Sequence, residues 1–146
     1  MADPEGDRIV NAGELVDFTL RLGREPSPSG AEGAVARIVA AEMERLGFAI
    51  ETDDLGNVVG TIDAGPGPCI LFDAHMDTVG VSNPDDWSRH PWGEVVGDRL
   101  YGRGSMDMKG PLAAAVHGIA SLRGSLRRGR VVVSATVAEE LVEGPA

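Results

Sequence analysis

Two apolar runs in this 146-residue chain are each followed at once by side chains that can bind cations or move protons. Residues 69–75 read CILFDAH and lead into Asp77, and residues 130–137 read RVVVSATV and lead into Glu139 and Glu140. Continuous apolar runs of this length are typical of strands buried on both faces of a mostly parallel sheet. In open α/β sheets, ligands bind at the carboxyl ends of such strands. The runs therefore predict an α/β fold with its ligand site at one edge of the sheet.

Helices and shorter strands are predicted on both sides of the first run. Apolar residues at helical spacing predict helices over residues 11–22, 30–46 and 111–124, each with a glycine at or just after its end. Ser29 and Glu32 fit a capping box at the start of the second helix. Because no linker or repeat interrupts the pattern, we expect one layered domain over residues 1–146, a sheet flanked by helices, with a flexible N-terminus at residues 1–10. The predicted strands cover residues 48–52 and 57–63, and a hairpin covers residues 94–102.

Composition disfavours several classes of partner. The net charge of −10 argues against binding to a nucleic-acid backbone. No stretch approaches the ~20 apolar residues that a membrane-spanning helix needs, and the acidic start lacks the layout of a signal peptide. We therefore expect a cytoplasmic protein without membrane contacts. The single cysteine, Cys69, rules out an internal disulfide and a cysteine-rich zinc site.

Chemically active side chains gather in three short segments, DAHMDT, GRGSMDMKG and AEE. His75 and Asp77 alternate on one face of a strand end, where a carboxylate can fix the tautomer of a metal-binding imidazole. Glu139 and Glu140, if extended, face opposite ways, so one can bind a cation while the other reaches its water. Each segment alone has an ordinary alternative: a hydrogen-bonded histidine, a helix-capping Asp107, or solvated acids. Together they favour a cation site.

The motifs AHMDTV, YGRGSMDMKG and VAEE, in this order, resemble those of the di-zinc amidohydrolases and metallopeptidases. That family includes acetylornithine deacetylase, succinyl-diaminopimelate desuccinylase, aminoacylase and carboxypeptidase G. The resemblance extends from about residue 11 to the end of the chain. A loop with Trp87, Pro91 and Trp92 is similar to that of the hydrolases linked to selenium metabolism. The resemblance implies the N-terminal part of a di-zinc exopeptidase-like (phosphorylase/hydrolase-like) catalytic domain, without the family's lid domain.

The resemblance also implies a role for each site residue. His75 would bind one zinc, Asp107 would bridge two zincs, and Glu140 would bind the second. Glu139 would be the general base and acid, while Asp77 would orient His75. Cobalt or manganese could replace zinc. The peptide bond after Asp107 is expected to be cis.

The implied substrate is an amide or peptide with a nearby carboxylate, such as an N-acyl amino acid or a small peptide. Each zinc would lack one protein ligand, because the family takes an acid and a histidine from later positions. His90 and His117 fit a loop and a packed helix better than a metal site. We therefore expect a truncated chain that binds metal weakly and is inactive alone.

The alternative is a non-catalytic remnant that binds a partner or forms homo-oligomers through an unfinished sheet edge at residues 130–137. A dinucleotide-binding module is disfavoured, because GRGSMD lacks the required glycine pattern.

Overall fold

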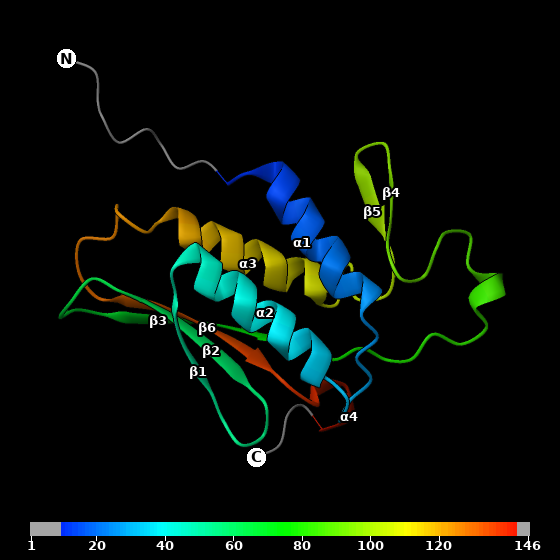
Figure 1. Ribbon diagram of the computed structural model, residues 1–146, viewed down its shortest axis with the longest axis horizontal. Helices are drawn as coiled ribbons and strands as arrows, with labels where there is room; N and C mark the ends of the chain where they lie inside the picture. The colour runs from blue at the N-terminus through cyan, green and yellow to red at the C-terminus, as the bar shows by residue number, and fades with distance from the viewer. Residues whose placement is uncertain (1–9, 143–146) are drawn as a thin grey trace.

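The computed structural model describes residues 10–142, so most of the segment expected to be flexible lies outside the described residues (Figure 1). No helix in the described part of the chain has the length and hydropathy needed to cross a membrane. The elements in chain order are α1 (Ala12–Arg24), α2 (Gly33–Leu46), β1 (Ala49–Thr52), β2 (Val58–Asp63), β3 (Cys69–His75), the 3-10 helix η1 (Pro84–Asp86), β4 (Glu94–Val96), β5 (Arg99–Tyr101), α3 (Lys109–Ser121), β6 (Arg130–Thr136) and α4 (Glu139–Val142).

The main sheet has four strands in the order β1-β2-β6-β3. The α/β class with packed helices is confirmed, but the expectation of a mostly parallel sheet is wrong. Only β3 and β6 pair in parallel, whereas β1 with β2 and β2 with β6 are antiparallel. The short turn between β1 and β2 forces an antiparallel pair, while β3 reaches β6 through a crossover that contains α3. The sheet is therefore mixed.

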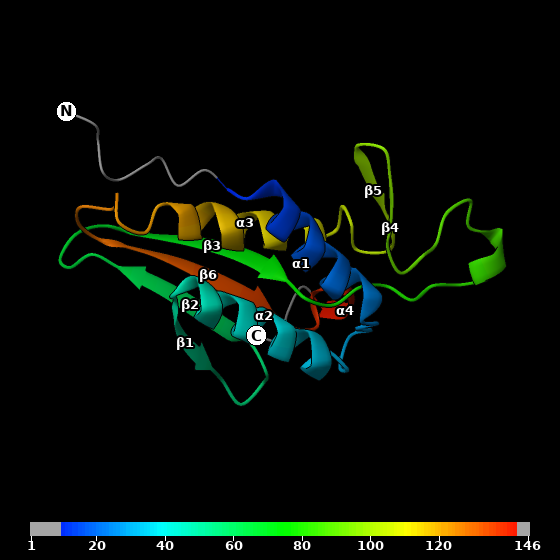
Figure 2. The same ribbon diagram turned by 45° about the horizontal axis from the view of Figure 1, so that its top comes forward.

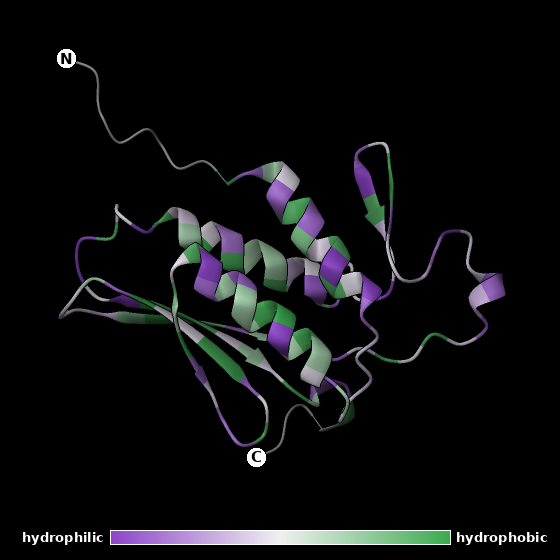
Figure 3. Ribbon diagram, viewed as in Figure 1, coloured by the Kyte–Doolittle hydropathy of each residue, from purple (hydrophilic) through white to green (hydrophobic). Residues whose placement is uncertain are grey.

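The core lies between the sheet and the layer formed by α1, α2 and α3 (Figures 1 and 2). Alternate residues of β6 (Val131, Val133 and Ala135) are buried, as expected for a strand with one face against helices. Hydrophobic and hydrophilic residues are interspersed along the helices (Figure 3). Each of the three long helices buries a subset of its residues. Strand β6 is also an interior strand of the sheet, because it pairs with β2 on one side and with β3 on the other.

Strand β3 departs from its predicted environment. Ile70, Leu71 and Phe72 are 55%, 60% and 46% exposed, whereas Ala74 and His75 are buried. The prediction that this strand is buried on both faces is therefore wrong for its first five residues in the described structure. The unfinished edge was also expected at residues 130–137, but β6 lies between β2 and β3, and the edges of the sheet in the described part of the chain are β1 and β3.

The helix ends show which local patterns held. Helix α1 continues through Gly23 and ends at Arg24, so the glycine stop predicted there is wrong. Gly47 ends α2 in the left-handed conformation, as predicted. The capping box predicted at Ser29 and Glu32 is absent, because Glu32 makes no side-chain cap and Ser29 bonds elsewhere. Instead, the Ser29 side chain bonds to Asp77 and the Glu32 side chain bonds to Ala138, just beyond the carboxyl ends of β3 and β6.

Candidate metal centre

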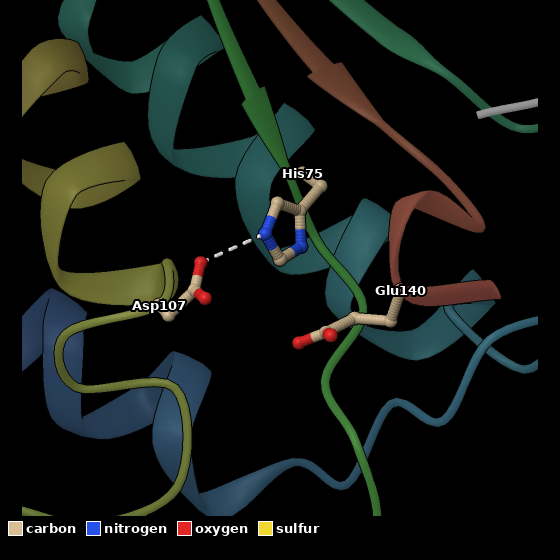
Figure 4. Close-up of side chains that lie close together, drawn as sticks. All are labelled: His75, Asp107 and Glu140. Atoms are coloured by element: carbon tan, nitrogen blue, oxygen red, sulfur yellow. Dashed lines mark hydrogen bonds and ion pairs between the residues drawn. The ribbon is translucent and has the colours of Figure 1, made fainter. Parts of the chain in front are cut away.

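Three elements bring His75, Asp107 and Glu140 together at one rim of the sheet (Figure 4). One ligand atom from each residue lies within 4.8 Å of the other two. His75 ends β3, Glu140 lies in α4 just after β6, and Asp107 precedes α3. Because β3 and β6 are parallel neighbours, their carboxyl ends open at the same place. The parallel pair therefore brings His75 and Glu140 to the same place, and the segment before α3 adds Asp107.

The His75 imidazole is 4% exposed and contacts acidic groups on both nitrogens. Nε2 lies 3.0 Å from Asp107 Oδ1 and 3.5 Å from Glu139 Oε2. Nδ1 lies 3.0 Å from the backbone oxygen of Asp77 and 3.3 Å from its Oδ1. Burial acts to lower the pKa of His75, but the contacts with Asp107, Asp77 and Glu139 outweigh it and raise the pKa above its usual value. In the neutral ring with its proton on Nδ1, the Nε2 lone pair would be free to bind a metal ion that Asp107 also contacts.

Asp77 is fully buried and contacts more than the histidine. The Ser29 hydroxyl donates to Asp77 Oδ2 over 2.5 Å. The backbone N–H groups of Glu139 and Glu140 donate to its Oδ1 and Oδ2 over 3.2 Å and 3.1 Å. Burial acts to raise the pKa of Asp77, but these hydrogen bonds outweigh it and hold the pKa below its usual value. An ionised Asp77 therefore connects the end of β3 to the start of α4.

The two acids do not lie on an extended backbone, as the sequence had suggested. They open the short helix α4, after Ala138 turns the chain in the left-handed conformation with φ 60°. Glu139 Oε2 approaches His75 Nε2, and a carboxylate oxygen of Glu140 belongs to the three-residue cluster. Both acids therefore reach the same site from adjacent positions, and the expectation that they face opposite ways is wrong.

Side-chain oxygens accept the four successive backbone N–H groups of this turn, residues 137–140. The pairs are Val137 with Asn57 Oδ1 at 2.9 Å, Ala138 with Glu32 Oε1 at 2.9 Å, and Glu139 and Glu140 with Asp77. Sequence reasoning missed Asn57 and Glu32. Glu32 was assigned to a helix cap, and Asn57 to the first position of the strand predicted over residues 57–63. A cap pattern without a partner inside its own helix gives no sequence signal of this longer reach.

The segment before α3 places Asp107 with its side chain 77% exposed, open to a ligand. The Asp107–Met108 peptide is cis, as the resemblance implied. The following Lys109 is 2% exposed, and its Nζ donates to the backbone oxygens of Leu22 and Glu25 over 2.9 Å and 2.7 Å. Burial lowers the pKa of Lys109 to about 8. The chain's single lysine thus anchors the segment that carries Asp107 to the end of α1.

Gly110 is required by close packing in the same segment. A Cβ placed there would lie 2.1 Å from the backbone oxygen of Ser105, closer than real atoms approach. The lysine and glycine of the MDMKG motif therefore have structural roles beside the exposed aspartate.

His90 and His117 do not join the ligand cluster found among the described residues. His90 lies in an exposed loop, where its Nδ1 accepts the Trp92 N–H. His117 is buried in α3 with its Nε2 3.1 Å from Glu42 Oε1 and its ring beside Phe18. Both positions agree with the loop and packing roles expected for them.

The donor set can hold a divalent metal ion. One imidazole and two carboxylates are borderline-to-hard ligands that suit Zn²⁺, and also Co²⁺ or Mn²⁺. The exposed side chain of Asp107 and the 42% exposed side chain of Glu139 leave one side of the cluster open. An open side is a feature of catalytic rather than structural metal sites.

Sequence comparison assigns the chain to a family of peptidases. The model of peptidase family M20/M25/M40 matches residues 71–146, which include all three members of the cluster. The match covers more than half of the chain, and the chain belongs to this family. The family resemblance inferred from AHMDTV, YGRGSMDMKG and VAEE is confirmed.

The chain is also similar to individual proteins of known sequence or structure. The uncharacterized protein YgeY of Escherichia coli K12 is 37% identical over 135 residues, which cover 90% of this chain and 33% of YgeY. Human carnosine dipeptidase 1 shares the fold with a TM-score of 0.77 and 21% identity, over 89% of this chain and 33% of that one. The YXEP protein of Bacillus subtilis, described as a dinuclear metal-binding M20 peptidase, has a TM-score of 0.70 and 19% identity, over 90% of this chain and 37% of that one. The chain thus spans about a third of the length of these relatives.

Proposed function

We propose that this chain supplies part of a dinuclear metal centre that hydrolyses amide or peptide bonds. The observation that carries the proposal is the convergence of His75, Asp107 and Glu140 within 4.8 Å in a member of this peptidase family. His75 and Asp107 would hold one ion, and Asp107 and Glu140 would hold the other. Zinc suits these ligands best, with cobalt or manganese as alternatives. The dinuclear YXEP peptidase, which shares the fold, supports two ions rather than one.

The chain's own residues divide the remaining chemistry. Bound metal ions would lower the pKa of a water and polarise the substrate carbonyl. Glu139, half-exposed beside His75, accepts a proton on its carboxylate as water attacks and passes that proton to the leaving amine. Asp77 is fully buried and does not reach a substrate. It keeps the His75 ring oriented. It acts on the reaction only through that ring and through the turn at residues 137–140 (the acidic turn), where the N–H groups of Glu139 and Glu140 donate to it.

The proposed substrate class is an N-acyl amino acid or a small peptide. The family assignment supports it, as does the dipeptidase with which the chain shares its fold. Amide hydrolysis requires a general base next to a polarised carbonyl, and Glu139 lies next to the proposed ligands.

The ligand count limits what residues 10–142 do by themselves. Catalytic zinc sites usually have three protein ligands, whereas each proposed ion here has two from the cluster. We therefore propose weak metal binding and no useful turnover for these residues alone. A second candidate function is self-association through the exposed apolar strand β3, which has only one neighbouring strand among residues 10–142 and could pair with a strand of another chain on its other side.

Calorimetric titration of the chain with Zn²⁺ and Co²⁺ tests the metal site. We expect weak binding that is lost in His75→Ala and in Asp107→Ala and is kept in Glu139→Gln. His90→Ala is the matched control, since that histidine lies outside the cluster. Metal binding that survives His75→Ala unchanged would refute the proposal.

A further inference from the structure

The turn that carries the two acids is held by residues that no local sequence pattern connects to it. Ala138 has a left-handed backbone, with φ 60°, immediately before Glu139. Such a conformation is unfavourable for a residue with a Cβ, so neighbouring groups must hold it in place. The direction of Glu139 and Glu140 depends on this one residue, because it sets how the chain leaves β6.

Glu32 holds this residue directly. Its side chain is 4% exposed, and Oε1 accepts the N–H of Ala138 over 2.9 Å and that of Gly30 over 3.0 Å. Glu32 stands at the N-cap position of α2 but makes no cap hydrogen bond to that helix. A carboxylate is costly to bury unless hydrogen bonds satisfy it. The buried Glu32 carboxylate therefore accepts hydrogen bonds from Ala138 and Gly30 and none from the first turn of α2.

Asn57 holds the preceding residue from a different element. Its Oδ1 accepts the Val137 N–H over 2.9 Å, while its Nδ2 donates to Asp53 Oδ2 over 2.8 Å. Asp53 also accepts the backbone N–H of Asn57 over 2.9 Å. These bonds fix which side of the amide faces β6. The Asp-Leu-Gly-Asn turn thus presents an oriented acceptor to the start of the acidic turn.

We propose that Glu32 and Asn57 are positioning residues that set the direction of Glu139 and Glu140. The inference rests on the proposed function, because it gives the turn a purpose in metal binding. Glu32 and Asn57 come from the N-terminus of α2 and from the β1–β2 turn, and Asp77 completes the set from the end of β3. Groups that orient metal ligands commonly change metal affinity by about 10–100-fold when removed.

Amide hydrogen exchange of the metal-free chain, followed by NMR, tests the contact itself. We expect the Ala138 N–H to exchange at least about tenfold faster in Glu32→Ala than in the unmodified chain, because its acceptor is gone. Glu32→Gln keeps a carbonyl oxygen at the same place and should restore most of the protection. Glu42→Ala is the matched control. It removes another buried carboxylate of α2, about 15 Å along the helix, and should leave residues 137–140 unchanged.

Co²⁺ titration, read by the visible absorption spectrum, tests the consequence for the site. We expect the Co²⁺ dissociation constant to rise about tenfold or more in Glu32→Ala, with an altered spectrum, and to recover to within about threefold in Glu32→Gln. Glu42→Ala should lower the unfolding midpoint without changing the spectrum. If Glu32→Ala does not fold, Asn57→Ala is measured in its place and should expose the Val137 N–H and weaken Co²⁺ binding in the same way.

The outcomes separate the two proposals. If the unmodified chain binds no Co²⁺ but Glu32→Ala still exposes the Ala138 N–H, the proposed function fails and the contact stands. If the unmodified chain binds Co²⁺ and Glu32→Ala binds it with the same affinity and spectrum, the positioning role is overturned. Equal weakening by Glu32→Ala and Glu42→Ala would also overturn it, since the effect would then be one of stability alone.

Discussion

Strands β3 and β6 are parallel neighbours of equal length and similar apolar composition, yet they lie in different environments. The middle of β6 is buried against the helices, whereas the first five residues of β3 are exposed. Their carboxyl ends, in contrast, are alike, because each leads into buried contacts that build the acidic site. The comparison shows that an apolar run alone does not determine burial. A strand with such a run is buried only where neighbouring elements cover it.

The strongest test of this difference places a charge in the middle of each strand. Val133 of β6 is fully buried, and Phe72 of β3 is its register partner. We expect Val133→Asp to cost on the order of 4 kcal/mol of unfolding free energy, because it leaves a buried charge without a partner. Phe72→Asp should cost less than about 1 kcal/mol, as is usual at exposed positions. Urea unfolding followed by circular dichroism measures both, and equal losses would show that β3 is covered in solution.

A second test compares Asp73, which lies in β3, with Asp77, which follows the end of that strand. Asp77 is fully buried and accepts hydrogen bonds from three other residues, whereas Asp73 is exposed. We expect Asp77→Ala to cost about 3 kcal/mol, since hydrogen bonds to charged groups contribute about 1.5–3 kcal/mol each and the freed N–H groups stay buried. Asp73→Ala should stay within about 0.5 kcal/mol. Thermal unfolding of the two variants checks the difference, which would vanish if the turn did not depend on Asp77.

The exposed edge of β3 also gives a test in association rather than stability. We expect the chain to self-associate at high concentration and Leu71→Lys to weaken this about tenfold, because a charge on an edge strand blocks strand pairing. Light scattering across a concentration series measures the effect. Leu55→Lys, at another exposed leucine outside the strands, serves as the control. A clean monomer at every concentration would rule out self-association through this edge.

The smallest effect concerns the helices that cover β6. Glu42 of α2 is 3% exposed and contacts Arg21 at 2.6 Å and Arg45 at 2.7 Å. Burial acts to raise the pKa of Glu42, but the two arginines outweigh it and hold the pKa below its usual 4.5. A lowered pKa adds stability above pH 4.5 that is lost as the pH falls through the lower value.

We therefore expect the chain to lose stability below about pH 4.5 with a component that Glu42→Gln lacks, on the order of 1 kcal/mol. The Nε2 of the nearby His117 lies 3.1 Å from Glu42 Oε1, so the variant His117→Gln separates the contribution of this contact. Unfolding midpoints between pH 7 and pH 3 measure the slopes. Parallel slopes for the unmodified chain and Glu42→Gln would contradict the assignment.

Much of this fold could be predicted from sequence because its signals are local or carry a strong pattern. The apolar run of β6, the glycine that ends α2 and the three chemical motifs all gave correct placements. The crossover between β3 and β6 brought the motifs to one rim, as the rule for strand ends predicts. The parallel character of the whole sheet was overestimated because composition does not record the direction of β1 and β2.

The support of the site could not be predicted, since it depends on contacts between distant segments. Ser29 and Glu32 match a helix-capping pattern, and nothing local distinguishes that use from hydrogen bonds to Asp77 and Ala138. The positive φ of Ala138 is equally hidden, because alanine carries no preference for that conformation. The sequence motifs therefore identified the residues of the candidate site and missed the residues that hold the turn beside it.

The left-handed turn at Ala138 has a consequence for anyone who would transplant this motif. A short peptide containing VAEE, or the same letters grafted after a strand of another scaffold, would carry both acids but not their orientation. Acceptors from three separate segments would have to travel with it. The orientation of the two acids in VAEE is thus a property of the folded domain and not of the motif alone.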